Sequence, residues 1–231
     1  MNMKKGKLIV LDGSDGSGKA TQTRFLIARL HKEGYKVKTL DFPQYETNFF
    51  GALIGECLTG EYGDFIAIDP HVGSVLYAAD RFESKPKIEE WLKKGYVVVL
   101  DRYVSSNQIH QGGKIVHPKR QKEFLSWLDQ MEHGVFGLPR PDIITYLDVP
   151  TLISQSLLKA EDQKQKKVYM KRRKTDLAEA NVDHQAASRS NALKLVKKLN
   201  HWKKIDCTKK GELLSREEIA EKVWEQVAQI L

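Results

Sequence analysis

Gly13, Gly18 and Lys19 form the clearest chemical pattern in this sequence of 231 residues, G-x-x-x-x-G-K. Glycines in such a turn let backbone N–H groups close around an anion, and the lysine adds a positive point charge. The next position normally holds Ser or Thr, whose hydroxyl ligates Mg²⁺, but this chain has Ala20 there and Thr21 one place later. A purely structural turn is the alternative, yet the spacing and the lysine favour nucleotide-phosphate binding. The predicted phosphate-binding residues are Gly13, Ser14, Asp15, Gly16, Ser17, Gly18, Lys19, Ala20 and Thr21.

Asp101 and Arg102 form a second candidate group, because they directly follow a continuous apolar run at 96–100. In an open α/β sheet, ligands bind outside the carboxyl ends of the strands, where the glycine-rich loop is also expected. Asp101 could therefore hold Mg²⁺, directly or through water, and Arg102 could clamp phosphate oxygens with its planar guanidinium. An ordinary Asp–Arg pair that caps the next helix is the alternative.

Two pairs of residues lie four positions apart and so share a helix face, Tyr77 with Arg81 and Asn107 with Gln111. An aromatic ring and an arginine can sandwich a nucleobase and donate to its carbonyl edge, and amides can read a base edge. Taken alone, the same residues also suit a core tyrosine, a surface arginine and two surface amides.

Basic residues concentrate at 163–174, which contains seven Lys or Arg and no acidic residue in a chain of net charge +8. Near its centre, Arg172 and Arg173 could stabilise the charge that spreads over the oxygens of a transferring phosphoryl group. A solvated charged face and a nucleic-acid surface are the alternatives. We expect a lid at about 160–178 within a single domain that spans 1–231.

Apolar runs and helical periodicity predict an alternation of strands and helices. The predicted strands are 8–11, 36–42, 96–100, 143–147 and 204–207. The predicted helices are 21–31, 52–58, 72–82, a separate helix from Pro86 to 95, a helical turn at 104–111, 118–131, one from about 151, 176–199 and 215–230. This alternation implies a parallel sheet with right-handed crossovers.

The composition is ordinary for a soluble protein, with 41% hydrophobic and 29% charged residues. No apolar run approaches the roughly 20 residues of a membrane helix, and the first seven residues lack the apolar core of a signal peptide. Cys57 and Cys207 are far apart and lack metal-site spacing, which suits a reducing compartment. These features predict a cytoplasmic protein without a membrane partner.

Five segments, in order along the chain, resemble the thymidylate kinases, nucleoside-monophosphate kinases that make dTDP from dTMP and ATP. They are LDGSDGSGKATQ at 11–22, FP at 42–43, YAADRFE at 77–83, DRYVSSNQIHQGG at 101–113 and YLDVP at 146–150. DRYVSSN is the most discriminating, because other P-loop kinases rarely combine it with YAADR. The resemblance implies an α/β fold of the P-loop NTPase type, with a five-stranded parallel sheet flanked by helices on both faces and a basic lid.

On the acceptor side, the resemblance implies roles for the matching residues. Asp15 corresponds to an acidic residue that hydrogen-bonds the 3′-hydroxyl of the acceptor sugar, and Phe42 to an aromatic residue beside the acceptor. His110 stands where many relatives carry an aromatic residue that crowds a ribose 2′-hydroxyl. Arg102 matches the arginine that reaches the phosphates, and Asp101 the carboxylate associated with Mg²⁺.

For the base, the resemblance implies that Tyr77 stacks on thymine and that Arg81 contacts a thymine carbonyl. Asn107 and Gln111 match polar residues near the base. The implied acceptor-binding residues are Asp15, Phe42, Tyr77, Arg81, Arg102, Asn107, His110 and Gln111. The implied catalytic residues are Lys19, Asp101, Arg102, Arg172 and Arg173.

Two departures from the family pattern affect these roles. Ala20 replaces the usual hydroxyl residue, so Mg²⁺ would be held largely through water and Asp101. Gln44 and Tyr45 occupy the neighbourhood in which the family often has an arginine. The loop also lacks an internal basic residue, which fits a catalytic arginine supplied by the lid.

The implied activity is transfer of the ATP γ-phosphoryl group to dTMP, with Mg²⁺ as cofactor and a homodimer as the usual assembly. One alternative keeps the fold but changes the acceptor to another nucleotide or a nucleoside. Another is a catalytically weak, nucleotide-dependent binder of nucleic acid, suggested by Ala20 and the lysine-rich run. Nucleic acid is not the expected partner.

Overall fold

The computed structural model describes residues 5–162 and 181–231, which fold around a parallel sheet of five strands in the order β2-β3-β1-β4-β5. The strands are β1 (Lys7–Gly13), β2 (Val37–Asp41), β3 (Val97–Asp101), β4 (Ile143–Asp148) and β5 (Trp202–Asp206). All four pairings between them are parallel. The predicted fold class is therefore confirmed.

Strand β1 lies at the centre of the sheet because both of its faces are apolar. Leu8 and Val10 belong to the core on one side of the sheet, and Ile9 and Leu11 to the core on the other. This alternation follows from the two-residue period of a strand, whose successive side chains point to opposite faces. Such a strand is stable only where helices cover both faces.

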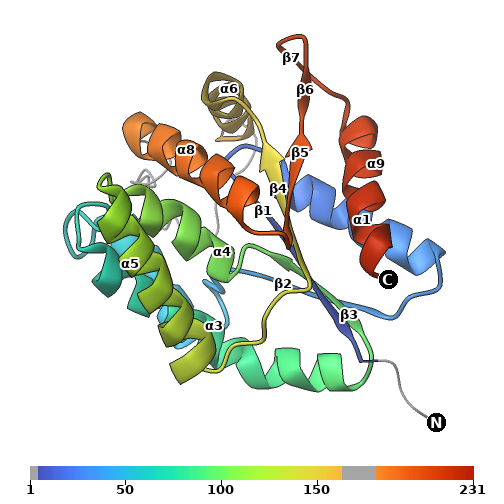
Figure 1. The fold of residues 1–231 in the computed structure, drawn as a ribbon, viewed down its shortest axis with the longest axis horizontal. Helices are drawn as coiled ribbons and strands as arrows, with labels where there is room; N and C mark the ends of the chain where they lie inside the picture. Colours follow the sequence, from blue (N-terminus) through green and yellow to red (C-terminus); the bar gives the residue numbers. More distant parts are fainter. Residues whose placement is uncertain (1–4, 163–180) are drawn as a thin grey trace.

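Helices cover both faces of the sheet, as Figure 1 shows. Helices α1 (Lys19–Lys32) and α9 (Arg216–Val227) pack on one face. Helices α3 (Pro70–Lys93) and α8 (Val182–Lys198) pack on the other, with α5 (Pro118–Asp129) outside α3. The remaining helices are α2 (Phe49–Leu58), α4 (Val104–Ser106), α6 (Thr151–Asp162) and the short η3 (Ala228–Ile230). None of the helices in the described part of the chain has the length and apolarity needed to span a bilayer.

Helix α3 corrects the prediction of two helices separated at Pro86. It runs without a break from Pro70 to Lys93 with Pro86 inside it. A proline removes one helical hydrogen bond and disfavours a helix interior. Here Ala78 before the proline and Ile88 after it are both completely buried, so tertiary packing on the two sides outweighs the local preference.

Two π-helical segments and a small hairpin were not expected. The segments η1 (Asn107–Gln111) and η2 (Gln130–Val135) continue α4 and α5. The hairpin joins β6 (Thr208–Lys209) to β7 (Glu212–Leu213). The predicted helix at 176–199 is described only from residue 181, and α8 starts at Val182. Most of the predicted lid, at 163–178, lies outside the described residues.

The register of the sheet places the carboxyl ends of β1 and β3, which carry the predicted site residues, side by side. Leu11 of β1 is paired with Asp101 of β3, and Gly13 of β1 with Leu147 of β4. The loop after β1 and the Asp-Arg pair at the end of β3 therefore meet at one edge of the sheet.

Candidate active site

The glycine-rich loop turns tightly between β1 and α1. Gly16 and Gly18 both have positive φ, at 75° and 84°, where side chains with a Cβ are disfavoured. A Cβ on Gly16 would lie 2.2 Å from the carbonyl oxygen of Ser154, so this glycine also permits the close approach of α6. The glycines thus form the tight turn that their spacing predicts.

Lys19 lies under this loop and is 8% exposed. Its Nζ donates to the carbonyl oxygens of Gly13 at 3.1 Å and Ser14 at 2.8 Å. Burial and the neighbouring Arg102 guanidinium lower the pKa of Lys19, against the opposing effect of Asp15 and other carboxylates. An anion bound in the loop would offset the cost of holding this ammonium group in a buried place.

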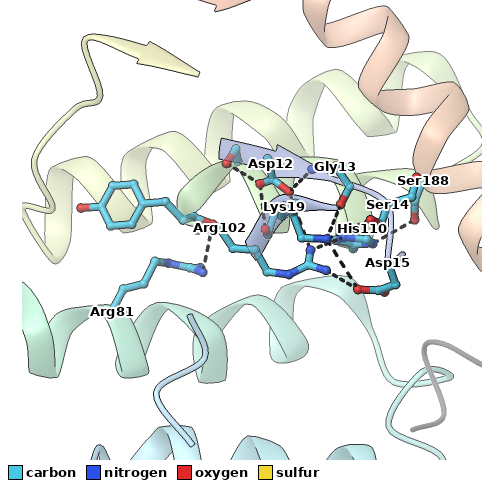
Figure 2. Close-up of polar contacts among 12 residues, drawn as sticks. Asp12, Gly13, Ser14, Asp15, Lys19, Arg81, Arg102, His110 and Ser188 are labelled. Atoms are coloured by element: carbon cyan, nitrogen blue, oxygen red, sulfur yellow. Dashed lines mark hydrogen bonds and ion pairs between the residues drawn. The ribbon is translucent and has the colours of Figure 1, made fainter. Parts of the chain in front are cut away.

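Arg102 is the centre of the charged cluster (Figure 2). Its Nη2 pairs with the Asp15 carboxylate, and its Nη1 lies 3.2 Å from Nε2 of His110 and 3.7 Å from Oδ1 of Asp12. Burial acts to lower the pKa of Arg102, but Asp15 and Asp12 outweigh it and raise the pKa above its ordinary value. The guanidinium is therefore permanently charged at the edge where a phosphate would enter.

The backbone of Arg102 is in the left-handed region, with φ of 66°. Such a conformation costs a residue with a Cβ roughly 1–2 kcal/mol. Its N–H donates to the carbonyl oxygen of Leu11 at 2.9 Å, which extends the pairing of β1 and β3 past the strand end. The neighbouring strand therefore holds the backbone in the conformation that presents this side chain.

Asp12 is a site residue that sequence reasoning missed. It is completely buried, and its carboxylate accepts hydrogen bonds from the Gly13 N–H at 2.8 Å and from the hydroxyls of Ser105 at 2.6 Å and Ser106 at 2.8 Å. It therefore ties the start of the loop to α4. The available signal was a carboxylate in an otherwise apolar strand, next to the first glycine of the pattern.

Asp101 has the chemistry of a magnesium ligand. Within residues 5–162 and 181–231, its carboxylate accepts no hydrogen bond. Burial raises the pKa of Asp101, while Lys19 and Arg102 oppose that shift. The described residues contain no cluster of three or more His, Cys, Asp or Glu that could enclose a metal ion. Mg²⁺ is usually held by one or two carboxylates together with waters and substrate phosphates, so a single carboxylate such as Asp101 could hold it.

A second arginine, Arg81, is buried with a carboxylate of its own. Its Nε and Nη2 each donate to Glu132 at 2.8 Å, and its Nη1 donates to the carbonyl oxygen of Tyr103 at 3.2 Å. Asn107 donates to the same Glu132 at 2.7 Å and to the carbonyl oxygen of Ser74 at 3.1 Å. The structure thus brings Arg81 and Asn107 together, and it rules out the alternative of a surface arginine.

Glu132 was not found from the sequence. It is completely buried on η2, 51 positions after Arg81, and no local pattern marks it. It belongs to the site through Arg81 and Asn107, whose orientation it sets.

The other residues predicted to bind the acceptor on the side of its base are Tyr77, Gln111 and Phe42. Tyr77 packs against Phe65, with ring centroids 5.9 Å apart. Gln111 is buried beside Gly73, where an added Cβ would lie 3.2 Å from the amide oxygen. Phe42 is buried against Tyr103, with centroids 6.0 Å apart. The surface-amide alternative is therefore wrong for both Asn107 and Gln111.

The predicted lid arginines, Arg172 and Arg173, lie outside the described residues. Ala20 is exposed on the first turn of α1 and supplies no hydroxyl. Thr21 is partly buried one position later. At the position where the loop usually has a metal-binding Ser or Thr, the structure therefore offers no hydroxyl, as the sequence indicated.

Comparison with known proteins agrees with this geometry. The family model described as thymidylate kinase matches residues 11–219. Human thymidylate kinase is 33% identical over 149 residues, 64% of this chain and 64% of that protein. Thymidylate kinase of Mycobacterium tuberculosis is 35% identical over 136 residues, 58% and 62% of the two chains. These matches span slightly less than two thirds of each relative. A probable thymidylate kinase of Pyrobaculum aerophilum is 32% identical over 164 residues, 70% and 74% of the two chains.

A solved structure of thymidylate kinase from Candida albicans has the same fold, with a TM-score of 0.69 at 24% identity. The superposition covers 97% of this chain and 92% of that one. The family match covers nearly the whole chain, including the glycine-rich loop, the Asp-Arg pair and the buried Arg81. The protein belongs to the thymidylate kinase family.

Proposed function

We propose that the protein transfers the γ-phosphoryl group of ATP to dTMP, giving dTDP. The observation that carries this proposal is the juxtaposition of Lys19 and Arg102, two enclosed cations at adjacent strand ends. A phosphate donor on the loop and a phosphate acceptor at Arg102 would lie next to each other. Phosphoryl transfer depends mainly on positioning and on stabilising negative charge, and two cations at one edge supply both.

The donor binds at the loop of residues 13–21. Backbone N–H groups and the positive end of α1 hold its phosphates, and Lys19 turns from the loop carbonyls toward them. This movement exchanges two neutral acceptors for charged oxygens, which form stronger hydrogen bonds with an ammonium group. Asp101 would hold Mg²⁺, with water in place of a hydroxyl at Ala20, and the ion would neutralise phosphate charge.

The acceptor binds between Arg102 and the base-side residues. Arg102 contacts the acceptor phosphate, and Asp15 accepts a hydrogen bond from the 3′-hydroxyl. Tyr77 stacks on the thymine ring. Arg81 uses three of its five N–H donors on Glu132 and Tyr103, which leaves two for a base carbonyl.

Further residues complete the acceptor site in this proposal. Asn107 and Gln111 line the base, and the Gln111 amide oxygen has no hydrogen-bond partner within the described part of the chain. Phe42 packs behind the acceptor and His110 lies beside the sugar. Arg172 or Arg173 stabilises the transferring group from the lid.

A homodimer and a cytoplasmic location are part of the same proposal. Apolar side chains are exposed along α3 as far as Phe82, with Val72 59% exposed and Phe82 47% exposed. A second copy of the chain packing on this helix would bury them. Light scattering during size-exclusion chromatography tests the dimer, and a mass of about 26 kDa, which is that of one chain, would contradict it.

A coupled assay with Mg-ATP and a panel of dTMP, dUMP, CMP and AMP tests the activity. We expect dTMP to have the highest kcat/KM. If another monophosphate has a higher kcat/KM than dTMP, that monophosphate is the acceptor and dTMP is not. A protein that phosphorylates none of them, yet binds DNA or RNA in a salt-sensitive manner, would be a nucleotide-dependent nucleic-acid binder.

A further inference from the structure

A histidine and a serine lie directly behind the Arg102 guanidinium. The Nε2 of His110, on η1, is 3.2 Å from Nη1 of Arg102. The Nδ1 on the other side of the ring is 3.2 Å from Oγ of Ser188, on α8. Figure 2 shows this row of side chains, with Arg102 also turned toward Asp15.

The chemistry of the two partners determines where the imidazole proton lies. A guanidinium has five donors and no acceptor, so the His110 nitrogen that faces it must be an acceptor. The proton of the neutral ring therefore lies on Nδ1, where it is donated to the Ser188 hydroxyl oxygen. A serine at this place can accept the proton, whereas a second cation could not.

We propose that His110 is a positioning residue for phosphoryl transfer, whose Nε2 lone pair holds Arg102 while Ser188 fixes the required tautomer. This inference rests on the proposed function, in which Arg102 binds the acceptor phosphate. It assigns His110 a task additional to lying beside the sugar.

Two separate partners are needed because Arg102 has a long and rotatable side chain. Asp15 takes Nη2 and His110 takes Nη1, so both ends of the planar fork are held. Without His110, the guanidinium can turn toward Asp12, whose Oδ1 is already 3.7 Å from Nη1. Orientation would then be lost at the group that must meet the phosphate.

Helix α8 is attached closely enough to keep His110 in place. Asn191 donates to the carbonyl oxygens of Gln108 at 2.7 Å and Ile109 at 3.0 Å, just before the histidine. Gly113 admits the helix, because an added Cβ would lie 3.2 Å from Cα of Ser188. The backbone that carries His110 and the serine that orients its ring are therefore one packed unit.

The surrounding charges keep the ring in its accepting form. Burial and the Arg102 guanidinium hold the pKa of His110 well below its ordinary value, and His184, whose tilted ring has its centroid 5.7 Å away, and Lys19 act in the same direction. Asp15 is the opposing charge. Protonation at low pH would remove the lone pair and place a third cation beside Arg102 and Lys19, so activity should fall on the acid side.

The tautomer can be measured on the whole protein without substrate. Long-range ¹H–¹⁵N correlation spectra at pH 7 should show His110 with its proton on Nδ1. Assignment comes from the loss of that signal in His110→Gln. A His110 protonated on Nε2, or on both nitrogens, would overturn the inference.

Kinetics with dTMP test the consequence for the reaction. His110→Phe keeps a ring but removes the acceptor, and we expect kcat/KM to fall by up to about 100-fold. His110→Gln places an amide oxygen near the Nε2 position and should recover at least about tenfold of that loss. The acid limb of the wild-type pH profile should be weaker in His110→Gln. His201→Phe, at an exposed histidine before β5, is the control and should behave as wild type.

The two proposals fail in different ways. If Phe and Gln at position 110 both turn over dTMP like the wild type, the positioning role is wrong and the kinase assignment stands. If the wild-type protein phosphorylates no monophosphate, the kinase assignment is wrong, and the tautomer measurement decides whether the Arg102–His110 contact exists. A melting temperature for each variant separates a loss of folding from a loss of activity.

Discussion

The site holds two arginines in contrasting ways. Arg102 lies at a strand end among several charges, with partners on three different segments and a left-handed backbone. Arg81 lies inside the protein, where one edge of its guanidinium, Nε and Nη2, pairs with Glu132 and its Nη1 donates to one carbonyl oxygen. The first arrangement leaves the guanidinium partly accessible to a ligand, with 16% of its side chain exposed, whereas the second encloses the charge and its carboxylate in a rigid, nearly neutral unit.

The difference suits the two halves of a nucleotide. A phosphate group is charged, so it can be held by a cation that stays partly accessible and can exchange a carboxylate partner for the phosphate. A base is neutral and is read by directional donors, so an arginine that serves it must be oriented, and its charge must be compensated while it is buried. Substitutions on the two sides should therefore differ in kind, with losses of rate on one side and losses of stability on the other.

The largest expected effect is on the phosphate side. Arg102→Ala and Lys19→Ala should each lower kcat on the order of 10³-fold with dTMP, because charge stabilisation is lost at the transferring group. Steady-state kinetics at saturating substrates measure this. Arg140→Ala removes an exposed arginine that pairs with Asp129 and should leave kcat unchanged. If kcat falls less than tenfold in Arg102→Ala and Lys19→Ala, these two residues do not stabilise charge at the transferring group.

The next effect concerns the buried pair. Glu132→Leu should lower the free energy of unfolding by about 3–5 kcal/mol, because Arg81 is left buried without its carboxylate. The double variant Arg81→Met with Glu132→Leu should recover most of that loss, since no buried charge remains. Chemical denaturation provides the values.

The exposed pair of Asp129 and Arg140 is a matched control for the buried pair. Asp129→Ala should change the free energy of unfolding by no more than about 1 kcal/mol. If the double variant is no more stable than Glu132→Leu, the charge compensation described for Arg81 is wrong.

A smaller effect is expected where α4 joins the loop. Ser105→Ala removes one of two hydroxyls that donate to the buried Asp12 carboxylate and should cost about 1–2 kcal/mol of stability. Ser156→Ala, at an exposed serine on α6, is the control. A melting temperature equal to that of the control variant would show that Ser106 and Gly13 suffice to hold Asp12.

The smallest effect is a slope of stability with pH on the phosphate side. Burial and Lys114 lower the pKa of His184, so the unfolded chain takes up a proton near pH 6.5 before the folded chain does. Its contribution to stability is complete above pH 6.5 and is lost as the pH falls from there through the lower native pKa. His184→Phe should flatten the dependence of the unfolding free energy over this window. If the slope of the unfolding free energy with pH is unchanged in His184→Phe, a different group causes the pH dependence.

Local sequence predicted the phosphate side better than the base side. The loop, Asp101 and Arg102 lie within short segments next to buried strands, and parallel strands in one sheet bring their carboxyl ends to one edge. Asp12 was missed because one polar residue inside an apolar run has no spacing to mark it. On the base side, the four-residue spacing of Asn107 and Gln111 falls in a π-helical segment, where that spacing loses its usual meaning.

Helix α3 likewise shows that local sequence alone does not determine the structure. A proline predicts a helix boundary from local sterics, but Ala78 and Ile88 are buried on either side of Pro86, and packing decides the outcome.

The sequence by itself determined the parallel sheet, the glycine-rich loop and the family, because these depend on periodicity and on short motifs whose geometry is local. Only the tertiary structure decided which partners hold each arginine. Glu132 is 51 positions from Arg81, and Ser188 is 78 positions from His110. Such contacts arise when distant helices pack on one sheet, and no spacing along the chain encodes them.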